Sequence, residues 1–94
     1  MDSVFKALSD PTRRKILQLL KEKDLTVTDI LEHVHMTQPS LSHHLDALKR
    51  AGLVVPERNG QFIVYSLNLS VFEEAEAFIL NFFSYDHPDT PSAN

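Results

Sequence analysis

The sequence contains no cysteine and no tryptophan, and only two of its 94 residues are glycine. Without cysteine, the chain has neither disulfides nor thiolate metal sites. With two glycines it has no glycine-rich phosphate loop, and it also lacks the His-Glu-x-x-His and Gly-x-Ser-x-Gly motifs of common hydrolases. These absences indicate that the protein is not an enzyme and that it needs no cofactor.

Long apolar runs are missing as well. No stretch approaches the roughly 18 apolar residues of a membrane span, and the first residues do not join a basic region to an apolar one, as a signal peptide does. We therefore expect no membrane insertion and a cytoplasmic location. A chain of 94 residues forms one small domain, and a domain of this size gains stability from oligomerisation.

Four of the five histidines lie in two short clusters, His33 with His35 and His43 with His44. A metal site requires several ligands on a common face. The first pair straddles the end of a predicted helix, and the adjacent residues of the second pair point about 100° apart on another helix. The sequence therefore predicts no metal, although a metal-dependent histidine protein stays an alternative for metal analysis to test.

The net charge of −4 opposes a general attraction to nucleic acid. Whether the chain can bind nucleic acid therefore depends on how its charges are distributed. Residues 1–23 carry six basic and three acidic side chains, and residues 37–66 carry three basic and two acidic ones. Residues 67–94 carry five acidic side chains and no lysine or arginine. Any contact with nucleic acid must therefore use a local patch outside the C-terminal third of the chain.

Helix-start signals and apolar spacing predict four helices, then a hairpin, then a fifth helix. The helices are expected at residues 3–9, at 11–23, in a short segment after residue 26, at 38–51 and at 70–84. Their start signals are Asp10-Pro11, Thr26 with Asp29, Thr37 ahead of Pro39, and Ser70 with Glu73.

Gly52 follows the fourth helix and predicts a left-handed cap there. Asn59-Gly60 between two β-rich runs predicts the hairpin. The fold class is mainly α with a small β-hairpin, in one domain over residues 1–85. The remaining residues, 86–94, contain two prolines and no apolar periodicity, so we expect a disordered tail.

A short helix, a brief turn and a longer helix with exposed polar residues form the helix-turn-helix pattern, and a hairpin directly after it is a wing. In the longer helix, Leu41, Leu45 and Leu48 share the apolar face. The side chains that we expect to contact DNA from this helix are Gln38, Pro39, Ser40, Ser42, His43 and Arg50. The alternative is an ordinary solvated face. For His44, on the flank, we expect a hydrogen-bonded structural role.

Two further segments carry candidate DNA contacts. At the tip of the wing these are Arg58, Asn59 and Gln61, which suit the minor groove or the backbone unless the tip is an ordinary turn. Arg13 lies in a basic run at the start of the second helix, where cations oppose the helix dipole. This favours an external phosphate. The alternative is a solvated turn in which Arg14 bonds to Asp10.

The last predicted helix is apolar over nearly 200° of its circumference, twice what a surface helix needs. The excess predicts a homodimer interface formed by the first and last helices. The residues expected there are Val4, Phe5, Leu8, Phe72, Phe78, Ile79, Phe82 and Phe83. The alternative is that the core of the single chain uses the whole apolar surface.

Three groups of residues resemble the ArsR/SmtB family of winged-helix repressors, and in particular its small cysteine-free members. FKALSDPTRRKIL at 5–17 is similar to the opening of these proteins, QPSLSHHL at 38–45 to their recognition helix, and 58–67 to their wing. The resemblance runs from about Val4 to Phe83. It implies a homodimer that represses its operon by occupying an operator, with DNA contacts from Gln38, Ser42 and His43.

The resemblance also allows the metal-sensing positions of the family to be checked. Its thiolate segment aligns with residues 24–30, where Thr26 and Thr28 replace both cysteines. Its metal site on the last helix aligns with positions that hold no good set of ligands, namely Leu69, Val71, Phe82 and Tyr85. Regulation by metal at these sites is therefore not expected.

The leading hypothesis is a sequence-specific repressor that binds a near-palindromic operator as a homodimer, regulates its own gene, and responds to a small-molecule effector, to a protein effector or only to its own level. The alternative is a winged-helix protein-interaction module that does not bind DNA, which the negative net charge favours.

Overall fold

The second helix begins at the cap that the sequence predicts, Asp10, whereas the first begins after Met1 without a side-chain cap. The structure, a computed structural model, describes residues 1–85. Helix α1 spans Asp2–Leu8, and α2 spans Pro11–Glu22. The carboxylate of Asp10 accepts hydrogen bonds from the backbone N–H groups of Thr12 and Arg13 at 2.7 and 3.3 Å. A side chain that satisfies these otherwise unpaired donors fixes the start of α2.

Helix α3 is one turn long and spans Val27–Leu31. Thr26 and Asp29 form the predicted capping box, in which each side chain accepts the other residue's backbone N–H at 3.2 Å. This reciprocal pair lets so short a segment start as a helix.

Helix α4 spans Gln38–Arg50, and Thr37 accepts the Ser40 N–H at 3.3 Å to cap it. Its end is a Schellman motif. Gly52 has a φ of 80°, its N–H donates to Lys49, and the N–H of Leu53 donates to the carbonyl of Leu48. Both predicted ends of this helix are thus confirmed.

The hairpin consists of β2, Val54–Asn59, and β3, Phe62–Leu67, which pair antiparallel from Val54 with Leu67 to Asn59 with Phe62. Its two-residue loop is therefore Gly60-Gln61, one residue later than expected. Gly60 has a φ of 64°, and favoured hairpin turns have a residue with positive φ at this first position.

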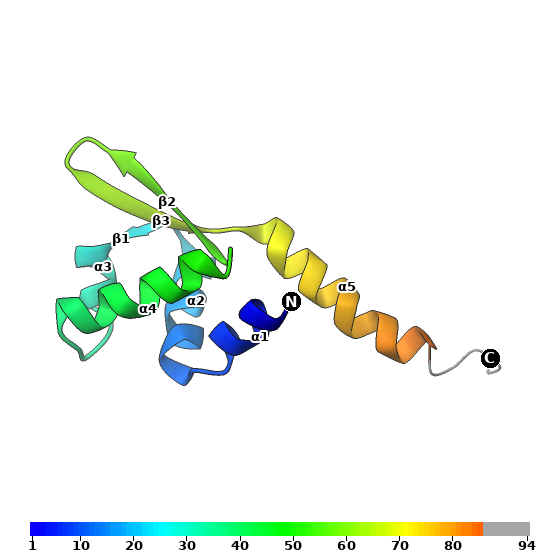
Figure 1. The fold of residues 1–94 in the computed structure, drawn as a ribbon. Helices are drawn as coiled ribbons and strands as arrows, with labels where there is room; N and C mark the ends of the chain where they lie inside the picture. The colour runs from blue at the N-terminus through cyan, green and yellow to red at the C-terminus, as the bar shows by residue number, and fades with distance from the viewer. Residues whose placement is uncertain (86–94) are drawn as a thin grey trace.

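A third strand, β1 at Leu25–Thr26, was not expected from the sequence. It pairs antiparallel with β3, Leu25 opposite Tyr65 and Thr26 opposite Val64, so the strand order is β1-β3-β2. The sheet therefore joins the base of the wing to the start of α3 (Figure 1).

The last helix, α5, spans Leu69–Tyr85 and begins one residue earlier than predicted. The predicted capping box at Ser70 and Glu73 is wrong, because Ser70 already lies within the helix. Asn68 sets the start instead. Its N–H donates to the carbonyl of Leu53 at 2.9 Å, and its own carbonyl accepts the N–H of Val71 at 3.2 Å.

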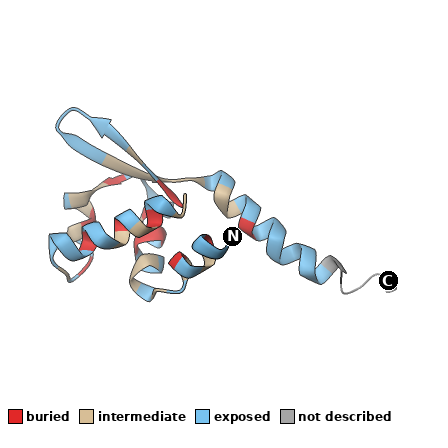
Figure 2. Ribbon diagram, viewed as in Figure 1, coloured by how far each residue is buried: buried red, intermediate tan, exposed pale blue. Residues whose placement is uncertain are grey.

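The core is entirely apolar and is centred between α2, α3 and α4. Its most completely buried large side chains are Ile16, Ile30, Leu41, Leu45, Leu48 and Leu53. Among the α5 residues whose burial is described, only Ala75 is fully part of it, with Val71 and Phe72 packed at its edge. Beyond Phe78, which contacts Phe5 of α1, the helix extends away from the other elements, and its surface is mostly exposed (Figure 2). The predicted tail, residues 86–94, lies outside the described residues.

Candidate nucleic-acid interface

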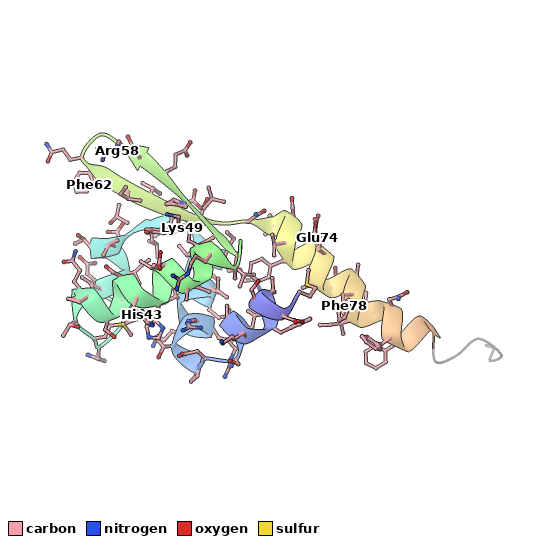
Figure 3. The ribbon with its side chains drawn as sticks, in the orientation of Figure 1. His43, Lys49, Arg58, Phe62, Glu74 and Phe78 are labelled. Carbon is pink, nitrogen blue, oxygen red and sulfur yellow. The ribbon has the colours of Figure 1, made fainter. Side chains whose placement is uncertain are left out.

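One face of α4 is buried and the other is open to solvent. Leu41, Leu45 and Leu48 are at most 1% exposed and hold the apolar face against the core. The predicted contact residues on this helix are all exposed: Gln38, Pro39, Ser40, Ser42, His43 and Arg50. Figure 3 shows His43 on the outer side of α4. The helix thus presents hydrogen-bonding groups mainly along its first half, as a helix that reads base edges does.

An ion pair reduces the charge at the far end of this face. Arg50 lies 3.0 Å from Asp46, one turn earlier, and both side chains are more than half exposed. An exposed pair of this kind contributes little to stability and is readily exchanged for another partner. Arg50 therefore stays accessible to an external anion, but its charge is partly offset by the carboxylate.

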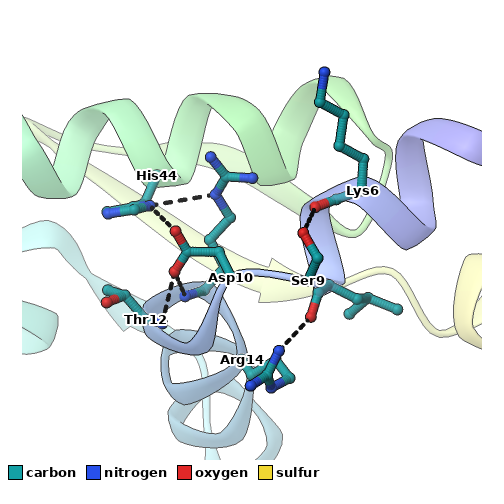
Figure 4. Close-up of polar contacts among 8 residues, drawn as sticks. Lys6, Ser9, Asp10, Thr12, Arg14 and His44 are labelled. Carbon is teal, nitrogen blue, oxygen red and sulfur yellow. Dashed lines mark hydrogen bonds and ion pairs between the residues drawn. The ribbon is translucent and has the colours of Figure 1, made fainter.

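The start of α2 is tied to α4 through a small polar network (Figure 4). The Nε–H of Arg13 donates to Nδ1 of His44 at 3.3 Å, and Oδ2 of Asp10 lies 3.9 Å from the same nitrogen. The predicted structural role of His44 is confirmed, since this half-buried ring bridges two helices. The Nε of Arg13 is used within the chain, so only its terminal nitrogens are left for an external ligand.

The same network alters the acidity of Asp10. Its partial burial raises the pKa, but hydrogen bonds from the N–H groups of Arg13 and Thr12 and the electrostatic effects of His44 and Arg13 outweigh burial. The net result is a pKa below the ordinary value of 3.8. Asp10 is therefore ionised at neutral pH and serves as a permanent cap.

Arg14 does not bond to the side chain of Asp10, as the alternative for this segment assumed. Its guanidinium donates instead to the carbonyl of Leu8 at 2.8 Å. This carbonyl is left unpaired at the end of α1, where a cation is also favoured by the helix dipole. Arg14 thus connects the end of α1 to the start of α2.

Arg58, Asn59 and Gln61 are exposed at the tip of the wing, and Figure 3 shows Arg58 there. Side chains alternate along β2, so Arg58 lies on the same face as Val54, which is buried beside α4. The guanidinium donates to the carbonyl of Gly60 at 3.4 Å rather than pairing with Glu57. Phe62, opposite Asn59 on β3, is 60% exposed. This residue is not among the predicted contacts, although an aromatic residue next to a hairpin turn is a recognisable sequence signal.

All but one of the residues predicted for a dimer interface are at least partly exposed. The ring of Phe78 lies 5.7 Å from that of Phe5 and 5.2 Å from that of Phe82. Phe78, Ile79, Phe82 and Phe83 are each at least 45% exposed, while Phe5, Leu8 and Phe72 are half-buried. Val4 is the exception, because it is 5% exposed and belongs to the core of the single chain.

The described part of the chain provides neither a metal-binding cluster nor a membrane-spanning helix. Within it, no three histidine or acidic side chains are grouped closely enough to hold a metal ion. No helix there has both the length and the apolar character needed to cross a bilayer.

Comparison with known proteins gives one consistent result. The family model described as "Bacterial regulatory protein, arsR family" matches residues 10–55, which include α2, α3 and α4. The transcriptional repressor SdpR of Bacillus subtilis (strain 168) is 55% identical over 82 residues, which cover 87% of this chain and 91% of that repressor.

Solved structures extend the similarity to the wing and α5. A crystal structure of an ArsR family transcriptional regulator superimposes with a TM-score of 0.84 at 26% identity, and the match covers 89% of this chain and 92% of that one. An ArsR-like transcriptional regulator from Rhodococcus sp. RHA1 gives a TM-score of 0.81 at 28% identity, covering 98% of this chain and 86% of that one.

Proposed function

Because the chain belongs to the ArsR family of bacterial regulatory proteins and is a transcriptional repressor with a winged helix-turn-helix fold, we propose that it acts as a homodimer on a near-palindromic operator. We place this operator in the promoter of its own gene, and we place the protein in the cytoplasm with that DNA. The observation that carries the proposal is the division of α4 into a fully buried apolar face and an exposed polar face beside a wing.

Sequence reading is assigned to the first half of α4. An amide such as that of Gln38 pairs with adenine, a hydroxyl such as that of Ser42 pairs with several bases, and His43 donates to guanine or to phosphate. The wing tip supplies Arg58 to the adjacent backbone or minor groove. Only Asp46 and Glu57 are acidic between residues 37 and 66, the segment that holds α4 and the wing, so few carboxylates lie near this surface.

The dimer is assigned to the exposed aromatic surface of α1 and α5. An exposed, continuous apolar patch on a small domain marks an interaction surface. A second copy covers such a patch by pairing it with itself about a two-fold axis. Two copies of α4 then face two half-sites about one helical turn of DNA apart.

Regulation is assigned to something other than metal at the usual family positions. Thr26 and Thr28 stand where the thiolate ligands of the family lie, and the hydroxyl of Thr26 caps α3. Leu69, Val71 and Phe82, at positions aligned with the site on the last helix, offer no ligand atoms. We infer that a small molecule, a protein partner or the amount of repressor sets operator occupancy.

Fluorescence anisotropy with labelled promoter DNA tests the proposal. The duplex comes from upstream of the protein's own gene and is titrated at two salt concentrations against a scrambled competitor. We expect binding that survives the competitor, weakens with salt, and falls by about 1–3 kcal/mol in His43→Ala. Equal binding to both duplexes, or none across genomic DNA, contradicts the proposal.

A second candidate function is a docking module for another protein, which the net charge of −4 favours. Capture of one protein partner from a nuclease-treated extract, by a protein that binds no genomic DNA, supports this function. Capture of that partner from an untreated extract but not from a nuclease-treated one contradicts this function.

A further inference from the structure

A hollow of about 240 Å³ lies between α1, the start of α2 and the second half of α4. Its lining includes four side chains that are cationic or become so on protonation, namely Lys6, Arg13, His43 and Arg50. Among residues 1–85, no aspartate or glutamate lines it. We propose that this hollow binds a phosphoryl group.

The shape of the hollow suits a small multiply charged anion. Its floor includes Ala7, Ala47 and Ala51, whose short side chains leave space where the helices meet. The cationic groups come from three different helices, so they approach that space from several directions. A tetrahedral oxyanion accepts hydrogen bonds in several directions, and guanidinium and ammonium groups are its strongest partners in proteins.

Neighbouring carboxylates show which cation supplies most of the attraction. Arg50 is paired with Asp46 at 3.0 Å, and the charge of Arg13 acts on Asp10. Lys6, in contrast, makes no ion pair with any side chain in the described part of the chain. Its ammonium extends away from the Asp10 network in Figure 4. Lys6 therefore brings a full charge to the hollow, and its removal tests the site with little effect on other contacts.

The hollow adjoins the surface proposed to read DNA, because His43 belongs to both. When α4 lies in a major groove, the phosphates that border the groove pass beside the second half of the helix, where the hollow lies. A DNA phosphate is thus one source of the phosphoryl group, and this source rests on the proposed function. A free phosphate-bearing small molecule offers the same chemistry, and its binding here opposes DNA binding.

The first experiment uses the protein without DNA. Inorganic phosphate is titrated into isotope-labelled wild-type protein, Lys6→Gln and Lys21→Gln, and the backbone amides of Ala47 and Ala51 are followed by NMR. Lys21 is an exposed lysine of α2 that does not line the hollow, so it is the matched control. We expect saturable shifts with phosphate, but not with chloride of equal ionic strength, in the wild type and Lys21→Gln and their loss in Lys6→Gln.

The second experiment measures DNA binding by the same three proteins. If the hollow takes a backbone phosphate, Lys6→Gln weakens binding several-fold to operator and scrambled duplexes alike and lowers the salt slope by about one. If the protein responds to phosphate but Lys6→Gln binds DNA normally, the hollow is assigned to a free ligand. If Lys6→Gln weakens DNA binding but the protein does not respond to phosphate, the hollow is assigned to DNA. If Lys6→Gln matches Lys21→Gln in both experiments, the proposal is overturned. A wild type that binds no DNA contradicts the proposed function, while the phosphate titration still decides on the hollow.

Discussion

The side chain of Arg13 donates to that of His44 across 31 positions of sequence, at 3.3 Å, and so joins the start of α2 to the middle of the helix proposed to read DNA. The adjacent His43 points to solvent instead. Two consecutive histidines therefore have separate tasks, one within the fold and one on the surface.

Substitution of each histidine by alanine should separate these tasks. His44→Ala removes the acceptor of the Arg13 Nε–H at a site where the ring is only 15% exposed, so we expect a loss of about 1–2 kcal/mol in the free energy of unfolding. His43→Ala should change that free energy by less than about 0.5 kcal/mol and weaken operator binding instead. Urea unfolding and anisotropy on both variants check this. The reverse pattern contradicts the assignment.

Acid should destabilise the protein through its helix caps. Hydrogen bonds from the backbone and hydroxyl of Thr26 lower the pKa of Asp29, and the network described above lowers that of Asp10. A lowered pKa in the folded state means that the stabilisation is complete above the ordinary value of 3.8 and is lost as the pH falls through the folded value. The urea concentration at the unfolding midpoint should therefore decrease as the pH is lowered below about 5.

The contribution of Asp10 to the loss of stability in acid is measured with Asp10→Asn, because asparagine still caps a helix but does not titrate in this pH range. We expect a flatter pH profile for Asp10→Asn than for the wild type. Asp24→Asn, at an exposed position after α2, is the control and should follow the wild type. Identical profiles for all three proteins contradict the assigned role of Asp10.

A charge on the aromatic surface of α5 should prevent association. Phe82→Glu places a carboxylate twice in each proposed dimer and removes two buried rings, so dimerisation should weaken by about 3 kcal/mol or more, over a hundredfold. Phe62→Glu on the wing is the matched control, since the two rings are 59% and 60% exposed. Sedimentation velocity should show monomers only for Phe82→Glu. If both Phe82→Glu and Phe62→Glu sediment as dimers, the assigned interface is wrong.

Gly52 should not tolerate a side chain. A Cβ atom there meets Val71 at an ordinary contact distance of 3.5 Å, so the cost comes from the backbone, whose φ is 80°. We expect Gly52→Ala to lower the free energy of unfolding by about 1–2 kcal/mol, and Gly52→Asn to lose less, since asparagine enters this conformation more easily. Equal stability of the wild type and Gly52→Ala in urea contradicts the argument.

The sequence predicts those parts of the fold that depend on neighbouring residues. The caps at Asp10, Thr26 and Thr37 and the end at Gly52 are each set within a few positions, and all four are confirmed. Strand β1 was missed because two residues carry no periodicity, and its partner lies about forty positions away. The start of α5 was misplaced because Leu53, a distant residue, holds Asn68.

The candidate site divides in the same way. The exposed face of α4 follows from helical periodicity, which places three leucines on the other side. The hollow at Lys6 cannot be predicted from helical periodicity, because only the packing of α1 against α4 brings this lysine near Arg50. Val4 and Phe5 show why the aromatic surface was only partly predictable, since adjacent positions on α1 divide between core and surface once that packing is set.

Thr26 belongs to two structures at once, because it pairs with Val64 of the wing and caps α3. If the wing moves relative to α3 and α4, either the strand pair at Thr26 or the cap of α3 must therefore break. We expect the separation between wing tip and α4 to be nearly constant. A DNA duplex must then adjust to the protein, and stretches whose grooves already have the matching width are favoured even at base pairs that no side chain touches.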